Sequence, residues 1–566
     1  MNQKSLALLF LITAAALALR LSGVGSLLPQ MTESDSRVIH QQVEHLQRGD
    51  EHPERDRNYG FYPLLVAKIT ACCFDDAPPR TPAADLEEHL QRASATHEHV
   101  RIVGAILSVL LVPATWLLAR WFLSAGAALL AAAFAAASTL ELWFAPQGRP
   151  HAAATAFAIL AVVAAVNLRR RGRPIDYGLA GVALALAVGS LESGLAVLPA
   201  FAVALLLREE PARKASIAWT ALSLAILALA LRWLYPFFFA ESHGRDAAQL
   251  TVGGGTLNLF GHLIFLDQFR GAGFAKLGAT LRDYDPWISA FAVVGIVLAV
   301  RPRLPEKWKD LAVLLAHAVP YAIAAGLYAR TYQRFAMPLI PYLCLLAAYA
   351  AQRISNPLPS LARGAVLALA LAPQAWLAIR LAVVRREPDT IEEAARWIAD
   401  HVEPADRIVV LPSLELPLPQ TPAALEENAR MSDNPNRPWF RYLSALAPSE
   451  RPTPAWNLVA MPMATDADRA AIQNDPAAYV RGLHAQWAVI EVYSEDRKPP
   501  VLRSVRIGLE KVAERVARFV PDRVDEGEDL PIVYQDDEFS RTSPWAWRAA
   551  RARCVGPVME VWRIRS

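Results

Sequence analysis

Long apolar stretches, separated by short polar connections, occupy the first two-thirds of the chain. A stretch of about 17–25 apolar residues is long enough to cross a bilayer as a helix. On this criterion the sequence predicts a polytopic α-helical membrane protein with about eleven spans. The predicted spans are 6–21, 102–119, 122–145, 152–168, two within 177–207, 215–238, 286–300, 311–328, 336–351 and 364–384.

The stretch 177–207 is longer than an ordinary span, and the polar segment SLESG at 190–194 interrupts it, which favours two short spans. The basic connections then fall at every second crossing, as the positive-inside rule requires of cytoplasmic loops. Counting 177–207 as one span would invert the later connections and put basic loops such as 208–214 and 301–309 outside. The basic connections are 169–173, 208–214, 301–309 and 352–363.

This alternation predicts a cytoplasmic N-terminus, with residues 1–25 as a retained signal-anchor in the plasma membrane (the inner membrane of a bacterium). A first outer loop, 23–99, and a second large one, 240–285, then lie outside together with the tail. We therefore predict a membrane-spanning catalytic domain over 1–384 and an extracytoplasmic soluble α/β domain over 385–566.

The tail has the patterns of both helix and strand. Residues 389–402, DTIEEAARWIADHV, have the apolar spacing of an amphipathic helix, with Ile391, Ala394, Ala395, Trp397 and Ile398 on one side. Short apolar runs separated by polar and proline-rich loops are typical of strands. These runs are 407–412, 487–493 and 557–564.

Composition narrows the classes of function. The net charge of +3 is small, and no basic aromatic groove is present, so nucleic acid is not an expected partner. The four cysteines include no CxxC pair, which argues against a structural zinc site, and the adjacent Cys72 and Cys73 are expected to be free thiols because a bridge between neighbours is strained.

Ionisable residues gather on the predicted outer face, above all in the stretch Met31–Leu65 that follows the first span. A carboxylate at a membrane surface can act as general base on an acceptor, and an arginine suits a phosphate because its fork donates two parallel hydrogen bonds. The candidates are Asp35, Glu33 and Glu192 as catalytic carboxylates, Arg334, Tyr332 and Arg149 for a donor phosphate, and His40, Arg57, Tyr62 and His151 for substrate binding.

Each leading candidate also has a structural interpretation. Asp35 has the residue type of a helix N-cap before VIHQQVEHLQ, and one residue can be both cap and catalyst. Glu192 sits between two apolar runs, where an ionisable residue tends to be functional, but at a connection its side chain can reach water. Arg334 can be an arginine that extends to the membrane interface.

Several motifs resemble the first outer loop and a later turn of GT-C-type glycosyltransferases, in particular the family of protein O-mannosyltransferases and the lipid A aminoarabinose transferase. The first loop has Asp35-Ser36, then Gly49-Asp50, then YGFYPLL at 59–65. The stretch YQRFAMPLIP at 332–341 is similar to the family's outer "RY..P..P" turn. The segment around Glu192 and the opening of the tail resemble further parts of the family's pattern.

The resemblance implies an inverting transfer of a sugar from a polyprenyl-phosphate donor to an acceptor outside the membrane. Asp35 would be the base, and Arg334 would hold the donor phosphate. The partners would be this donor, membrane lipids, and a lipid, glycan or protein acceptor. Ser36 replaces the second acid usual in the family, so a divalent metal ion and the second acid stay open. The substitutes for that acid are Glu33, Glu54, Asp56 and Glu192.

Two other classes of function compete with an enzyme. A transporter or flippase for a lipid-linked sugar would need charges deep within spans or repeated broken helices, and the spans are mostly rich in Ala, Leu and Val. A non-catalytic scaffold that presents the tail as a binding domain would leave the loop charges without convergence.

Overall fold

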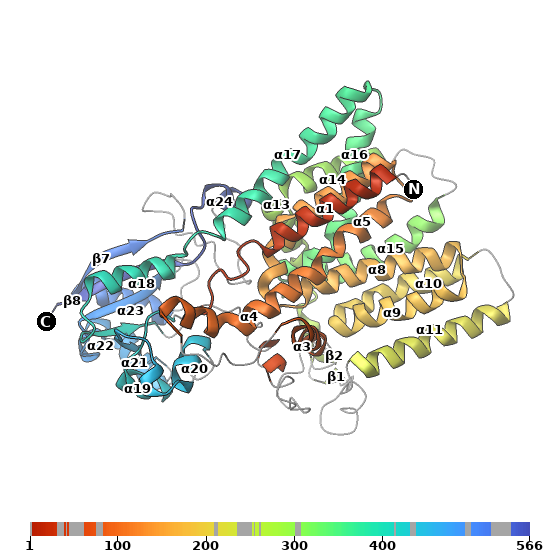
Figure 1. Ribbon diagram of the computed structural model, residues 1–566. Coiled ribbons are helices and arrows are strands. Elements are labelled where there is room, and N and C mark those ends of the chain that lie inside the picture. The colour runs from red at the N-terminus through yellow and green to blue at the C-terminus, as the bar shows by residue number, and fades with distance from the viewer. Residues whose placement is uncertain are drawn as a thin grey trace.

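The structure is a computed structural model of the chain, and Figure 1 shows a long helical bundle joined to a smaller α/β region. The residues it describes are 3–30, 39–40, 42–44, 62–74, 83–208, 213–234, 252–253, 255–259, 262–299, 307–411, 415–430, 437–463, 465–492, 500–521 and 545–565.

Every predicted span corresponds to a helix or to a pair of helices. Seven helices of the described chain are long and apolar enough to cross a membrane, or eight if one bent pair counts as a span. The other predicted spans are the shorter apolar helices α9, α10 and α14. The bundle contains α1 (Gln3–Leu21), α4 (Leu86–Val109), α5 (Leu111–Ala119), α6 (Ala125–Ala137), α7 (Thr139–Phe144), α8 (His151–Arg170), α9 (Pro174–Ser190), α10 (Leu198–Leu206), α11 (Arg213–Leu234), α14 (Pro286–Ala299), α15 (Trp308–Leu327), α16 (Ile340–Ser355) and α17 (Ser360–Val384).

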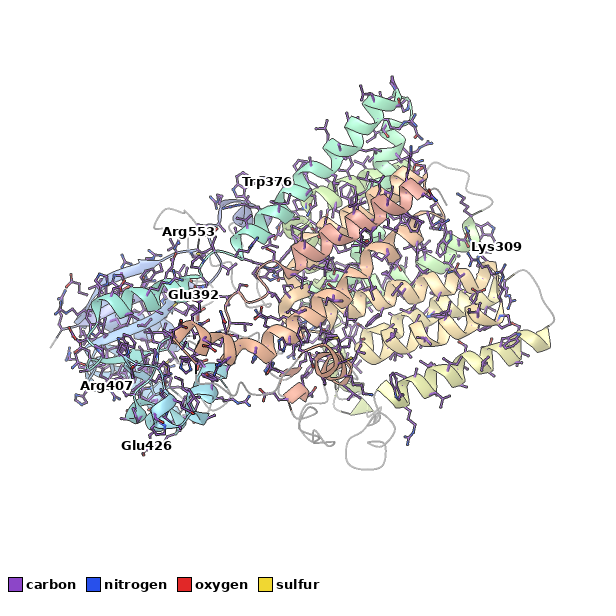
Figure 2. The ribbon with its side chains drawn as sticks, in the orientation of Figure 1. Lys309, Trp376, Glu392, Arg407, Glu426 and Arg553 are labelled. Carbon is purple, nitrogen blue, oxygen red and sulfur yellow. The ribbon has the colours of Figure 1, made fainter. Side chains whose placement is uncertain are left out.

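Large apolar side chains cover the outside of this bundle. Phe10, Trp233 and Leu369 each expose about 70% of their surface, and Trp376 projects outward from α17 (Figure 2). Exposed apolar surface on this scale is costly in water and favourable in lipid. The structure therefore agrees with a multi-pass membrane protein.

A break between α6 and α7 bends one span by about 40° at Ser138. Backbone groups freed by such a break must find partners inside the protein, because lipid offers none. Asp285, at the turn between α13 (Ala272–Tyr284) and α14, supplies one: its carboxylate accepts the Thr139 N–H at 2.7 Å and the Ser138 hydroxyl at 2.6 Å. Gln374 of α17 donates to the same carboxylate at 2.8 Å.

One end of the bundle, which we call the Arg385 end, joins the α/β region. Arg385 follows α17 and donates to the carbonyl oxygens of Leu142 and Trp143, at 2.6 and 2.9 Å, where α7 finishes. The loop after α1 lies at the same end, because a Cβ added to Gly23 (φ +68°) would lie 2.3 Å from the Cβ of Arg385. The ends of α1, α7 and α17 thus meet.

The opposite end, the Asp310 end, has a buried ionic cluster. The Nε atoms of Arg169 and Arg170, at the end of α8, donate to the two carboxylate oxygens of Asp310 at 2.7 and 2.9 Å. The Asp310 side chain is 2% exposed, and it lies in the first turn of α15. This cluster fixes α8 against α15. Figure 2 shows the neighbouring Lys309 far from Arg407 and Glu426 of the α/β region.

The described residues of the segment before α13 include no helix of membrane length. This segment contains a small antiparallel sheet in the order β1 (Val252–Gly253), β2 (Thr256–Leu259), β3 (His262–Phe265). The short apolar helix α3 (Tyr62–Cys73) falls within the predicted first outer loop, 23–99.

The C-terminal region is an α/β fold, which confirms the predicted class. Its sheet has the order β5-β4-β6-β8-β7, with β4, β5 and β6 parallel and β8 antiparallel to both of its neighbours. The predicted helix and three predicted strands are α18, β4, β6 and β8. The elements are α18 (Thr390–His401), β4 (Arg407–Val410), α19 (Pro422–Ala429), α20 (Pro438–Ala445), β5 (Asn457–Ala460), α21 (Asp466–Asn474), α22 (Pro476–Gly482), β6 (Trp487–Val492), α23 (Pro500–Val512), β7 (Ala513–Phe519), α24 (Trp545–Arg551) and β8 (Val558–Ile564).

Helix α4 projects from the bundle and supports this region (Figure 1). Leu86, Leu90 and Ala93 pack against an apolar cluster that includes Leu425 of α19 and Trp439 of α20. Nearby, the ring of His89 is hydrogen-bonded to the Tyr442 hydroxyl at 2.9 Å. A continuous helix therefore links the bundle to the α/β region.

The first loop also contacts α20 through a charged pair. Glu44 pairs with Arg441 at 2.6 Å and with His40 at 3.5 Å, and the His40 ring stacks on His97 of α4. Burial alone raises the pKa of the Glu44 carboxyl, but His40 and Arg441 outweigh burial and lower this pKa to about 2.

We expect Glu44→Gln to weaken the fold at neutral pH by on the order of 2 kcal/mol, because the ionised carboxylate and its two partners are lost. The wild-type advantage should be complete above the ordinary Glu pKa of 4.5 and should shrink as the pH falls toward 2. Thermal unfolding in detergent at pH 7, 5 and 3.5 measures it. Glu426→Gln, in an exposed pair with Arg430, is the control, and an equal loss at pH 7 and 3.5 would contradict the assignment.

We expect Asp310→Asn to destabilise the bundle by about 3 kcal/mol, because it leaves two arginines facing a neutral partner in a largely buried site. The measurement is the midpoint of thermal unfolding in detergent, and Glu426→Gln again serves as the surface control. A midpoint unchanged within a degree would show that α8 and α15 do not depend on this cluster.

Candidate active site

A short 3₁₀ helix, η5 (Gln333–Leu339), presents Arg334 at the Arg385 end of the bundle. Neighbouring helices hold this helix in place. The Tyr321 hydroxyl of α15 donates to the Phe335 carbonyl at 2.9 Å, and the Tyr284 hydroxyl of α13 donates to the Gln333 side chain at 2.8 Å. The span α15 and the helix α13 therefore fix the segment predicted to be an outer turn.

Arg334 meets two other predicted site residues. Its Nε donates to Nε2 of His151 at 3.1 Å, and its guanidinium lies 4.4 Å from the centre of the Tyr332 ring. Because Nε2 accepts this bond, His151 is neutral with its proton on Nδ1. The bond and the cation–π contact together orient the guanidinium.

Arg334 and His151 line a cavity of about 370 Å³ that opens to solvent, whereas Tyr332 contacts Arg334 from outside its lining. One face of the first two turns of α8 forms one wall, close to the positive end of this 20-residue helix. The segment 191–194 forms another wall. Gly194 allows that segment to approach α9, because an added Cβ would lie 2.2 Å from the Ala187 carbonyl oxygen. The lining residues are His151, Ala154, Thr155, Ala158, Leu191, Ser193, Gly194, His317, Tyr321, Arg334, Phe335 and Pro338.

The side chains of the predicted catalytic carboxylates are not among those that the structure describes. Glu33, Asp35 and Arg57 are outside the described residues, as are Glu54 and Asp56. Glu192 begins the 3₁₀ helix η2 (Glu192–Val197), and only its backbone is described. Its neighbours on both sides line the cavity, so the backbone of Glu192 passes the site.

Three predicted residues lie away from the cavity lining. Arg149 is buried in the turn that precedes α8, two residues before His151. His40 packs on α4, and Tyr62, at the start of α3, is buried beneath Gly104 of α4. A role for these three in binding stays a prediction.

The sequence analysis missed the two residues that α15 contributes, His317 and Tyr321. His317 is 1% exposed within a membrane-length helix, and an ionisable residue there is by default a functional candidate. A histidine inside a predicted span is visible in the sequence, although the apolar character of the rest of the span conceals it.

No group of three or more potential metal ligands of the His, Cys, Asp or Glu type occurs among the described residues. The first loop, with most of its carboxylates, lies outside that set, so the predicted option of a divalent ion stays a prediction.

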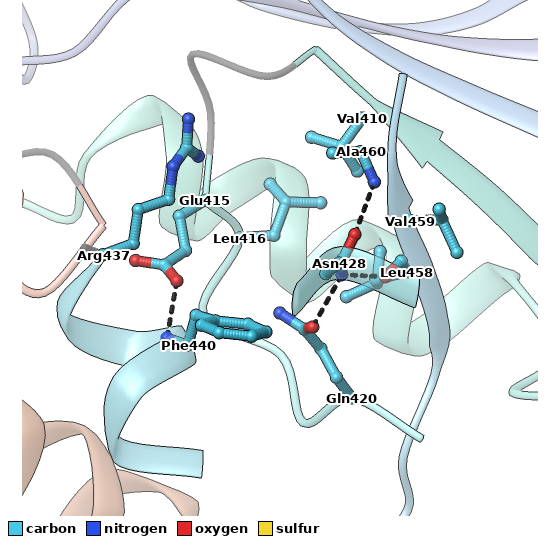
Figure 3. Close-up of a pocket in the computed structure, with 10 residues that line it drawn as sticks. All are labelled: Val410, Glu415, Leu416, Gln420, Asn428, Arg437, Phe440, Leu458, Val459 and Ala460. Atoms are coloured by element: carbon cyan, nitrogen blue, oxygen red, sulfur yellow. Dashed lines mark hydrogen bonds between the residues drawn. The ribbon is translucent and has the colours of Figure 1, made fainter. Parts of the chain in front are cut away.

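A second hollow, of about 340 Å³, lies in the α/β region at the carboxyl ends of β4 and β5 (Figure 3). Its polar groups brace the fold. Asn428 donates to Gln420 and to the Leu458 carbonyl and accepts the Ala460 N–H, while Glu415 accepts the Phe440 N–H at the start of α20. The cavity beside Arg334 is therefore the candidate site.

Comparison with known proteins gives one sequence match and several structural similarities. Residues 92–235 match the family model described as dolichyl-phosphate-mannose-protein mannosyltransferase. No curated protein sequence matches the chain. The apo oligosaccharyltransferase of Archaeoglobus fulgidus is similar at 14% identity with a TM-score of 0.48, over 86% of this chain and 69% of that one. ArnT from Cupriavidus metallidurans, bound to undecaprenyl phosphate, is similar at 13% identity with a TM-score of 0.45, over 92% of this chain and 97% of that one.

Both TM-scores are below 0.5, so the family match, rather than these two similarities, bears on function. The matched segment runs from α4 to α11 and includes His151 and the cavity segment 191–194. The match confirms the resemblance of this chain to GT-C-type membrane glycosyltransferases of the protein O-mannosyltransferase kind.

Proposed function

We propose that the protein transfers a sugar from a polyprenyl-phosphate donor to an acceptor on the extracytoplasmic face of the membrane. The observation that carries this proposal is the contact between Arg334 and His151, 3.1 Å apart in one cavity. The family match agrees with it, because a dolichyl-phosphate sugar is a donor of this chemical class.

The distribution of charge supports the extracytoplasmic location. Arg169, Arg170 and Arg171 lie at the Asp310 end of α8, and cytoplasmic ends of spans carry the excess of arginine and lysine. The Arg385 end, with the cavity and the α/β region, is then extracytoplasmic. The N-terminal end of α1, at the opposite end of the bundle, is then cytoplasmic.

The basic groups of the cavity suit a phosphate. Donation to His151 fixes the plane of the Arg334 guanidinium, and a planar fork held in place can bind two phosphate oxygens in parallel. The start of α8 adds the positive end of its dipole. Apart from the phenol of Tyr321, the described ionisable side chains that line the cavity are the nitrogen bases Arg334, His151 and His317.

In the proposed reaction Asp35 accepts the proton of an acceptor hydroxyl or amine. The acceptor atom forms a bond to the anomeric carbon of the sugar from the face opposite the phosphate. The bond between that carbon and the phosphate oxygen breaks with inversion, and the polyprenyl phosphate leaves with the bonding electron pair. Arg334 stabilises the charge that develops on this phosphate.

We expect Asp35→Asn to lower the transfer rate at least about 100-fold, because the amide cannot accept the acceptor's proton. The assay follows sugar transfer from a polyprenyl-phosphate sugar by the full chain in detergent. Glu51→Gln, in the charged stretch of the same loop, is the control. An Asp35→Asn protein with wild-type activity would refute the assignment of the base.

We expect Arg334→Ala to lower kcat/KM for the donor by about 100-fold or more, because the charge on the leaving phosphate loses its partner. Arg334→Lys should recover only part of this loss, since lysine keeps the charge without the planar fork. Arg330→Ala is the matched control: Arg330 is exposed and also lies over an aromatic ring, that of Phe265, but it does not line the cavity. Equal effects at 330 and 334 would contradict the phosphate assignment.

A further inference from the structure

His317 faces the same cavity as Arg334 from a different helix, and it lies deeper in the bundle. It is ten residues before the end of α15 at Leu327, which is about 15 Å along the helix axis. Burial of an imidazole at such a depth is unfavourable unless its nitrogens have partners. The contacts of the two ring nitrogens therefore decide what His317 can do.

One nitrogen is already bound within the protein. Nδ1 of His317 lies 2.7 Å from the hydroxyl of Tyr342, on α16. The other nitrogen, Nε2, is on the far side of the ring and is the one that can act in the cavity. Tyr342 comes shortly after η5 in the chain, so the helix that follows Arg334 also sets the contact of His317.

The direction of this bond follows from the needs of the phenol. Among the described residues, the bond to His317 is the one hydrogen bond of the Tyr342 hydroxyl. If the hydroxyl accepted a proton from Nδ1, its own O–H would lack an acceptor in apolar surroundings, which costs free energy. The phenol therefore donates to Nδ1. A neutral imidazole with an acceptor at Nδ1 has its proton on Nε2, so Nε2 is a donor.

We propose, on the basis of the function proposed above, that His317 binds the phosphate of the lipid donor through Nε2–H. Tyr342 is a positioning residue that fixes the tautomer. The phosphate is then held from two sides, by Arg334 on η5 and by His317 on α15. The ligand class is a phosphate group: a diester in the sugar donor, a monoester in the polyprenyl phosphate that leaves, or inorganic phosphate free in solution.

Two substitutions at one position separate this role from packing. The amide nitrogen of Gln reaches close to the position of Nε2, whereas the amide of Asn reaches only the position of Nδ1. We expect His317→Gln to bind undecaprenyl phosphate within about threefold of wild type. We expect His317→Asn to bind it at least tenfold more weakly, with the loss in transfer appearing mainly in KM for the donor.

The test of Tyr342 uses a double-mutant cycle. Tyr342→Phe should weaken binding about threefold in the wild-type background, because both tautomers of His317 become populated. It should have no effect in the His317→Gln background, since an amide has no tautomer to fix. A purely structural role for Tyr342 would give the same loss in both backgrounds and would overturn its assignment.

The binding measurement uses the full chain in detergent with three probes: undecaprenyl phosphate, undecaprenol and inorganic phosphate. Undecaprenol should not distinguish the Asn variant from the Gln variant, whereas both phosphate probes should. Binding of inorganic phosphate as tight as that of the lipid would show that the lipid is not the source. Equal behaviour of the Asn and Gln variants toward undecaprenyl phosphate, with thermal unfolding midpoints also equal, would overturn the proposal.

Failure of this inference can be told apart from failure of the proposed function. A wild-type protein that transfers sugar, with equivalent Asn and Gln variants, refutes the role of His317 alone. A protein that binds undecaprenyl phosphate in a His317-dependent manner, but transfers no sugar to any acceptor, refutes the transferase.

Discussion

A helix that breaks inside a membrane must satisfy its freed backbone groups within the protein, and this constraint organises the Arg385 end of the bundle. At the break between α6 and α7, the Asp285 carboxylate accepts the freed Thr139 N–H. At the end of α7, the Arg385 guanidinium donates hydrogen bonds to the carbonyl oxygens of Leu142 and Trp143. These bonds determine where the chain turns back to begin α8 at His151. Arg385 is also the first residue of the tail. The hydrogen bonds that fix the chain before α8, at the cavity, therefore also fix the point where the tail leaves the bundle.

This arrangement determines which side chains line the cavity. Its basic groups come from the start of α8, the middle of α15 and the 3₁₀ helix η5, which are distant in sequence. Hydrogen bonds orient these groups: Arg334 is bonded to His151, and His317 is bonded to Tyr342. The helix η5, which presents Arg334, is itself bonded to Tyr321 and Tyr284. Such preorganised donors favour a developing negative charge more than mobile ones do, because little reorganisation is needed during the reaction.

The spans and the α/β class of the tail could be predicted from the sequence because both depend on local patterns of apolar residues. The split of 177–207 into α9 and α10 was predictable from SLESG and the alternation of basic loops. Arg334 and His151 are 183 positions apart in the chain. The sequence therefore indicates both as candidate site residues, but it does not show that they are in contact. His317 was overlooked because one polar residue barely changes the hydropathy of its helix. The role of Asp35 stays a prediction, since the first loop lies mostly outside the described residues.

The length of one helix also sets a dimension of the molecule. Helices α4 and α5 run as a single helix of 34 residues, which is about 51 Å long, whereas the hydrocarbon core of a bilayer is about 30 Å thick. About 20 Å of helix therefore stands clear of the lipid, and its tip carries the apolar cluster that supports α19 and α20. The α/β region is thus mounted on a strut of fixed height. The length of this helix therefore fixes how far α19 and α20 stand from the lipid.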